Sequence, residues 1–159
     1  MHNITQTIKY RGKVVVKAIK DGKETTICET HNQGGSPLFA FLNKCLIGAY
    51  DPSLRPKYIT ASDENDTRII PLYPVSRTFI TTARDVQYTF TVPAASFGSG
   101  TFKIKKLYLY CDAYRGSSET LSDWSAQIEL DNIETFNTTA QDTLIIEWTL
   151  ALSSTDEEE

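Results

Sequence analysis

The sequence predicts a mainly β protein, an antiparallel β-sandwich or jelly-roll-like barrel of about eight strands with one short helix at about residues 37–47. Three observations lead to this fold class. Several runs alternate apolar and polar residues with a period of two, short turn signals separate them, and one stretch has apolar residues at helical spacing. At 159 residues the chain suits one domain. We expect it to span 1–153, followed by an acidic disordered tail over 154–159.

Four runs carry the clearest strand pattern. They are "TLIIEWTLALS" (143–153), "DVQYTFTV" (85–92), "TFKIKKLYLYC" (101–111) and "WSAQIEL" (124–130). In the third run the alternation changes phase across Lys105 and Lys106, which predicts a β-bulge. Nearer the N-terminus, "ITQTIKY", "KVVVKAIK" and "ETTICETH" are separated by Arg11-Gly12 and Asp21-Gly22. Such dipeptides join antiparallel strands, so we expect a three-stranded meander there.

The one helical stretch is "SPLFAFLNKCLIG", residues 36–48. Ser36 is a suitable N-cap, Pro37 suits the first helical position, and Gly48 suits the C-terminal stop. The apolar residues recur at helical spacing and predict one face that packs against a sheet. That face comprises Leu38, Phe41, Leu42, Cys45 and Leu46.

Composition and charge exclude several classes of function. The formal net charge is −4 and the isoelectric point is near 5.2, whereas proteins that bind nucleic acid cluster Lys and Arg. No apolar run approaches the roughly 18 residues that a membrane helix needs. The first ten residues lack the pattern of a signal peptide, and the three cysteines are widely spaced. We therefore expect reduced thiols, a cytoplasmic place of synthesis, and neither nucleic acid nor membrane as partner.

No pattern of catalytic residues stands out. "NQGGSP" resembles a phosphate-binding loop only in its glycines, because Pro37 stands where that motif needs a lysine. Cys28 and His31 are three residues apart on a strand, which places them on opposite faces. The histidines and cysteines lack the spacing of a zinc site. We expect a protein that is not an enzyme and has no cofactor.

One acidic turn is a candidate calcium site. "SDENDT" (62–67) clusters Asp63, Glu64 and Asp66. The spacing fails the EF-hand motif, since glycine and glutamate are missing at the required positions. Calcium also accepts irregular sets of carboxylate and carbonyl oxygens, so a looser site remains open beside the alternative of a solvated turn.

Three tyrosines are candidates for an interface. Tyr108 and Tyr110 lie on the strand face opposite Leu107, Leu109 and Cys111, and Tyr114 follows shortly after. Exposed aromatic rings pack in protein interfaces or stack on sugars. Contact between subunits, glycan binding and burial under a loop all remain open at this point.

The stretch "THNQGGSPLFAFLNKCLIGAYDPSLRPKYI" (30–59) resembles a segment of small virion proteins of tailed bacteriophages. It has a strand ending in His-Asn, a glycine turn, a Leu-Phe-x-x-Leu helix ending in Gly, and a proline-rich return. "TLIIEWTLALS" is also similar to the terminal strand of those proteins. The resemblance implies a multi-copy particle component and carries over no catalytic residue.

We therefore expect a non-enzymatic structural component of a bacteriophage virion, in the tail, collar or baseplate region, made in the bacterial host cytoplasm. Its partners would be copies of itself, in a ring or trimer, and other virion proteins. One alternative is a capsid decoration or head-fibre-anchoring protein. The other is a carbohydrate-binding β-sandwich module that recognises host-surface glycan through Tyr108, Tyr110 and Tyr114.

Overall fold

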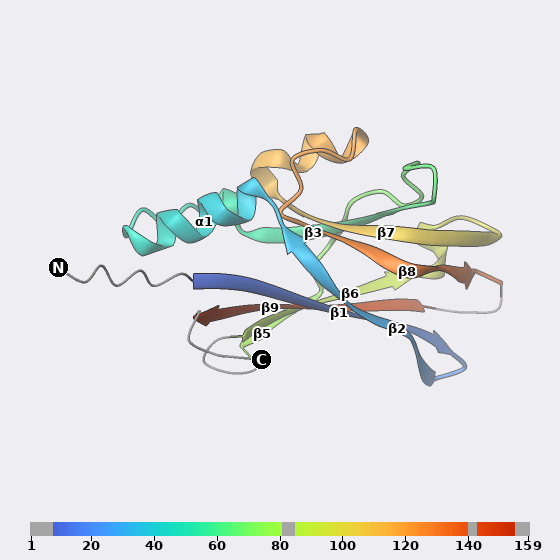
Figure 1. The fold of residues 1–159 in the computed structure, drawn as a ribbon. Helices are drawn as coiled ribbons and strands as arrows, with labels where there is room; N and C mark the ends of the chain where they lie inside the picture. The colour runs from blue at the N-terminus through green and yellow to red at the C-terminus, as the bar shows by residue number, and fades with distance from the viewer. Residues whose placement is uncertain (1–7, 81–84, 140–142, 155–159) are drawn as a thin grey trace.

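The computed structural model describes residues 8–80, 85–139 and 143–154. Within these residues the protein is mainly β, with two antiparallel sheets packed as a sandwich and one α-helix, which confirms the predicted fold class (Figure 1). Apart from Ser154, the predicted tail over 154–159 lies outside the described residues.

The element bounds are as follows. The strands are β1 (Ile8–Lys20), β2 (Lys23–Gly34), β3 (Pro56–Ser62), β4 (Tyr73–Pro74), β5 (Arg77–Ile80), β6 (Asp85–Pro93), β7 (Thr101–Cys111), β8 (Ala126–Asn137) and β9 (Thr143–Ser154). Within the described residues the α-helix is α1 (Ser36–Leu46), and the three short 3₁₀ segments are η1 (Pro52–Leu54), η2 (Ala94–Ser96) and η3 (Asp112–Glu119).

The strands are hydrogen-bonded in the order β4-β3-β7-β8-β2-β1-β9-β6-β5. One layer contains β5, β6, β9 and β1, and the other contains β4, β3, β7 and β8. Strand β2 belongs to both layers. It pairs with β1 along most of its length, and then Gln33 and Gly34 pair with β8. Figure 1 shows β2 rising from the lower layer toward the upper one.

The core lies between the two layers. Strand alternation places apolar side chains of both sheets in it, as the period of two predicts. The fully buried members include Val16, Phe90, Ile146 and Trp148 from one layer and Ile59, Leu107, Leu109 and Phe136 from the other. The predicted bulge in β7 is confirmed, because its register with β8 shifts between Ile104 and Lys106.

The predicted N-terminal meander is wrong in one respect. Arg11-Gly12 is not a turn, because both residues lie inside the continuous strand β1, where Gly12 pairs with β2 and β9 at once. A glycine in a strand interior costs backbone entropy but does not break a strand held on both sides. Asp21-Gly22 does form the tight turn between β1 and β2. Their φ values are 50° and 75°, as a type I′ hairpin turn requires.

Helix α1 begins one residue earlier than predicted. Gly35 is its N-cap and supplies no side-chain cap hydrogen bond, Ser36 is already helical, and Pro37 lies in the first turn. Sequence reasoning placed Ser36 at the cap because its hydroxyl suits that role. The helix leaves the end of β2 and extends away from the sandwich (Figure 1).

Gly35 is the junction between β2 and α1, and its lack of a side chain is required by packing. Its N–H donates to the carbonyl oxygen of Ser125 at 2.7 Å. A Cβ atom built on Gly35 would lie 2.2 Å from the carbonyl oxygen of Trp124 and 2.8 Å from its ring atom Cε3. The backbone of Gly35 is extended, with φ −108°, so close approach and not a left-handed turn explains the glycine.

We expect Gly35→Ala to lower the free energy of unfolding by about 1–3 kcal/mol, because the added methyl group overlaps a backbone carbonyl. The matched control is Gly116→Ala, since no atom of the described residues lies within 4 Å of a Cβ atom at Gly116 and its φ is not positive. The control should change stability by less than about 0.5 kcal/mol. Urea denaturation measures both. Equal effects of the two substitutions would show that Trp124 does not restrict position 35.

Candidate functional site

The structure contradicts the proposed tyrosine platform. Tyr108 and Tyr110 lie on the side of β7 opposite Leu107 and Leu109, as predicted, but their exposed fractions are only 3% and 0%. Tyr114 alone of the three is exposed, at 39%. The side of β7 that faces away from the main core is therefore a second buried surface, and it is unavailable for stacking on a sugar.

Both η3 and the chain after β3 lie against this side of the sheet. Segment η3 contacts β3 and β7, the Ser62 hydroxyl bonds to the Tyr108 hydroxyl at 3.4 Å, and Thr60, which pairs with Tyr108, donates to the Ile70 carbonyl oxygen at 2.6 Å. In Figure 1, η3 lies above β3 and β7, on the side away from β1 and β9. Arg68 holds this segment in place. Its guanidinium donates to the Ser118 hydroxyl at 3.2 Å and pairs with the Glu119 carboxylate at 2.8 Å. Sequence periodicity could not reveal this cover, because it depends on how a polar, irregular segment folds back over the sheet.

A second set of contacts attaches the start of η3 to β3. Asp112 accepts hydrogen bonds from Lys57 Nζ at 2.9 Å and from the Tyr58 hydroxyl at 2.8 Å. The Lys57 hydrogen bond is the largest cause that holds the pKa of Asp112 below its ordinary value. Arg115 lies 5.7 Å from the centre of the Tyr58 ring. This cluster attaches η3 to the sheet, and within it the charges of Lys57 and Asp112 neutralise each other.

The predicted packing face of the helix is correct only at its N-terminal end. Leu38 is 1% exposed, and Phe41 and Leu42 are partly buried. Cys45 and Leu46 were predicted to pack against a sheet and are exposed instead, Leu46 at 75%. The physical reason is the direction of α1, which takes its last turn beyond the end of the sandwich (Figure 1).

The exposed end of the helix forms an apolar surface, which we call the α1 tip and define as Leu46, Ile47 and Tyr50. Their exposed fractions are 75%, 78% and 56%. The tip is held in shape from two sides: the Tyr50 ring meets the Phe41 ring edge-on at 6.0 Å between centroids, and Lys44 pairs with Asp51 at 3.0 Å. Three large apolar side chains exposed together on a fixed surface are typical of a contact site.

The acidic turn uses its carboxylates locally. Asp63 accepts hydrogen bonds from the backbone N–H groups of Asn65 and Thr67, both at 2.9 Å. Asp66 has a left-handed backbone with φ 58° and pairs with Lys106 at 2.7 Å. Glu64 is exposed. Among the described residues there is no group of three His, Cys, Asp or Glu side chains that could hold a metal ion.

Cys28 and His31 do not form a nucleophile–base pair. Cys28 packs against the core, and burial raises its pKa to about 11. His31 is exposed and lies on the opposite side of β2 from Cys28, the same side as Glu29. Of the other thiols, Cys111 is buried and Cys45 is exposed beside the α1 tip.

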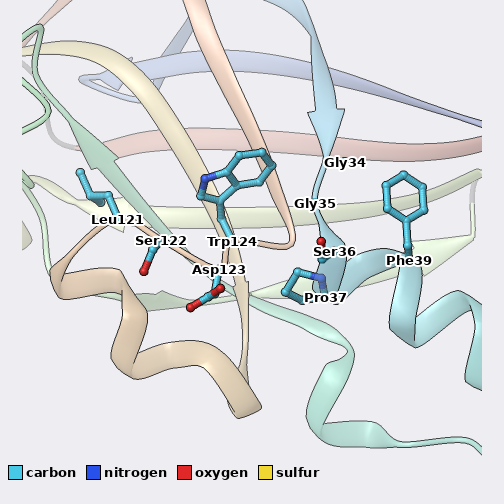
Figure 2. A pocket seen from close by; sticks show the side chains of 9 residues that line it. All are labelled: Gly34, Gly35, Ser36, Pro37, Phe39, Leu121, Ser122, Asp123 and Trp124. Atoms are coloured by element: carbon cyan, nitrogen blue, oxygen red, sulfur yellow. The ribbon is translucent and has the colours of Figure 1, made fainter.

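The glycine-rich stretch forms one wall of an open depression instead of a phosphate loop. Figure 2 shows Gly34, Gly35, Ser36 and Pro37 opposite the loop Leu121–Trp124, and the Phe39 ring, which also belongs to the lining, stands beyond Gly34 and Gly35. In that loop Leu121 and Asp123 both have left-handed backbones, with φ 53° and 50°. Sequence reasoning missed Trp124, because it read this residue only as the start of a strand. The sequence feature that could have identified Trp124 as a candidate site residue is its place in the polar stretch "SSETLSDWS".

Sequence reasoning also missed Phe39, Ile47 and Tyr50 as exposed apolar residues. Phe39 and Ile47 fall outside the helix face defined by Leu38, Phe41 and Leu42. Their position outside that face was the sequence feature that could have predicted their exposure. Phe39 is 47% exposed. A helix with apolar residues on two faces can be buried on one and available for contact on the other.

We expect Tyr110→Phe to leave the free energy of unfolding unchanged or to raise it by up to about 1 kcal/mol, because the buried hydroxyl has no hydrogen-bond partner among the residues that the structure describes. Tyr110→Ala should lower it by about 3–5 kcal/mol. Tyr114→Ala, at an exposed position, is the control and should stay within about 0.5 kcal/mol. Thermal unfolding followed by circular dichroism measures all three. Clear destabilisation by Tyr110→Phe would mean that the hydroxyl is satisfied.

We expect Cys45 to react with maleimide much faster than Cys28 or Cys111 in the folded protein at neutral pH. Cys45 is exposed, whereas burial raises the pKa of both other thiols and so lowers their thiolate fraction. Mass spectrometry of peptides after timed labelling measures the three rates. In urea the rates should converge, and a Cys28 that reacts as fast as Cys45 before unfolding would contradict its burial.

Among the described residues no helix is both long and apolar enough to cross a membrane. Comparison with protein-family models, with curated proteins and with solved structures found no match to this chain.

Proposed function

We propose that this protein is a non-enzymatic structural component that assembles through protein–protein contacts of the α1 tip. The observation that carries the proposal is the exposure of Leu46, Ile47 and Tyr50 together. Burying apolar surface contributes roughly 25 cal/mol per Å² of favourable free energy, so a partner that covers these side chains would stabilise the complex.

The shape of the tip supports the same proposal. The Phe41–Tyr50 ring contact and the Lys44–Asp51 ion pair restrain the helix end and the turn after it before any partner binds. A surface that is ordered in advance loses less conformational entropy on association. The tip also projects from the sandwich, where a neighbouring molecule can reach it (Figure 1).

The assembly that we propose is a bacteriophage virion, in the tail, collar or baseplate region, with a capsid decoration or head-fibre-anchoring role as the alternative position. This part of the proposal rests on the resemblance of residues 30–59 and of the last strand to small virion proteins. The proposed partners are copies of this chain and other virion proteins. The glycan-binding alternative through Tyr108, Tyr110 and Tyr114 loses its support, because two of its three rings are buried.

We expect the double substitution Leu46→Ser and Ile47→Ser to lower the mass measured by light scattering from that of an oligomer to that of a monomer. Both side chains are more than 70% exposed, so the fold and its thermal unfolding should be unaffected. Ile80→Ser is the matched control, since Ile80 is 74% exposed at the edge strand β5. An oligomer that survives the double substitution, or one that Ile80→Ser breaks, would overturn the role of the tip.

Cross-linking then separates two geometries of assembly. If two tips meet about a twofold axis, a short bismaleimide should join Cys45 of one copy to Cys45 of the next. If each tip meets a different surface, as in a ring, the Cys45 pair should stay unlinked while the double substitution still lowers the mass. If the protein is monomeric at all concentrations, the tip does not bind copies of this chain, and its partner must be a different protein.

A further inference from the structure

A second surface, separate from the α1 tip, is hollowed enough to hold a small ligand. It is the open depression between the β2–α1 junction and the loop Leu121–Trp124, with a volume of about 590 Å³ (Figure 2). Sites for small molecules occupy about 300–1,000 Å³. The depression can therefore hold one or two sugar rings or a molecule of similar size.

Trp124 supplies a fixed aromatic surface in this depression. Its ring and its carbonyl lie so close to Gly35 that a side chain at position 35 would overlap both. The same contact holds the indole in one place, while Trp124 stays partly exposed. In Figure 2 the Phe39 ring stands on the far side of Gly34 and Gly35 from the indole. Rigid aromatic rings of this kind stack on apolar faces of ligands at little entropic cost.

The polar groups of the depression are hydroxyls and one carboxylate. Asp123 is exposed, and its Oδ2 accepts a hydrogen bond from the Ser117 hydroxyl at 3.0 Å, which orients the carboxylate. A carboxylate has about four lone-pair positions, so further hydroxyl donors can bind there. Ser36 and Ser122 add exposed hydroxyl groups.

The charged side chains that line the depression indicate which class of ligand can bind there. The lining residues include Asp123 but neither Lys nor Arg. A phosphate, a sulfate or an acidic sugar would meet a negative charge without a cationic side chain to balance it. A neutral ligand with an apolar face and several hydroxyl donors matches both the indole and the carboxylate.

We propose that the depression binds a neutral saccharide, with one sugar ring stacked on Trp124 and its hydroxyl groups donating to the Asp123 carboxylate. This site goes beyond the proposed assembly role and differs from the buried tyrosine platform. It lies on the other end of α1 from Leu46 and Ile47, so the two surfaces can be tested independently.

The test is a titration of the full chain with maltotriose, cellotriose and tri-N-acetylchitotriose at millimolar concentrations, followed by tryptophan fluorescence. The protein has two tryptophans, and Trp148 is fully buried in the core, so a change in emission reports Trp124. We expect saturable binding of at least one of the three saccharides. Trigalacturonate, which carries acidic sugars, should bind at least tenfold more weakly than the best neutral saccharide.

Variants measured by calorimetry assign the contacts. Trp124→Ala should weaken binding by about tenfold or more, and Trp124→Phe by less, because phenylalanine keeps a stacking ring. Asp123→Asn should weaken it about fivefold, because a hydrogen bond to a neutral amide is weaker than one to a carboxylate. Asparagine tolerates the left-handed backbone that Asp123 adopts, so this variant should fold.

Asp66→Asn is the matched control, since Asp66 is also an exposed aspartate with a left-handed backbone, on a different loop. It should leave the affinity unchanged. The proposal is overturned if none of the three saccharides changes the emission of the folded protein, if trigalacturonate binds as tightly as they do, or if Trp124→Ala keeps full affinity. The double substitution Leu46→Ser and Ile47→Ser should alter the oligomer mass without altering saccharide binding, so the two proposals fail separately.

Discussion

The close contact between Gly35 and Trp124 fixes how strand β2 leaves the sandwich, and both exposed surfaces depend on it. The Gly35 N–H donates to Ser125, and the Ser125 N–H donates to Leu109 on β7 at 2.6 Å. This chain of hydrogen bonds sets the start of α1 against the upper layer. Only a residue without a side chain allows the two backbones to approach so closely. The direction of α1, and with it the exposure of its far end, follows from this junction.

The two sides of β7 show how similar apolar patterns can have different roles. Leu107 and Leu109 join the main core between the layers. Tyr108 and Tyr110 are buried on the opposite side, where Arg68 and Asp112 hold η3 against the sheet by charged hydrogen bonds. A two-sided apolar strand therefore did not mark an interface here, because a segment of the same chain covers its second side. Apolar area that remains exposed after such folding is the stronger sign of a contact site.

Helix α1 carries two surfaces of different chemistry at its two ends. Its first turn and the loop before β8 form a depression that combines an aromatic ring with hydroxyls and a carboxylate. Its far end presents exposed aliphatic side chains beside the Lys44–Asp51 ion pair and the Phe41–Tyr50 ring contact. Apolar side chains without polar partners favour a protein surface, whereas the mixed lining favours a ligand that can donate hydrogen bonds. The helix places both within reach of solvent while Leu38 in its first turn is buried.

Local patterns in the sequence correctly predicted the fold class, the alternation that places Phe90, Ile146 and Trp148 in the core, the bulge in β7, the Asp21-Gly22 turn and the helix to within one residue at each end. These features depend on local periodicity and on backbone preferences, which neighbouring residues encode. The tertiary structure alone decided that Tyr108 and Tyr110 are buried, that Leu46 is exposed, and that Trp124 meets Gly35. The physical reason is that periodicity identifies which residues share a face. What covers that face depends on contacts between segments far apart in the chain, and no local pattern specifies them.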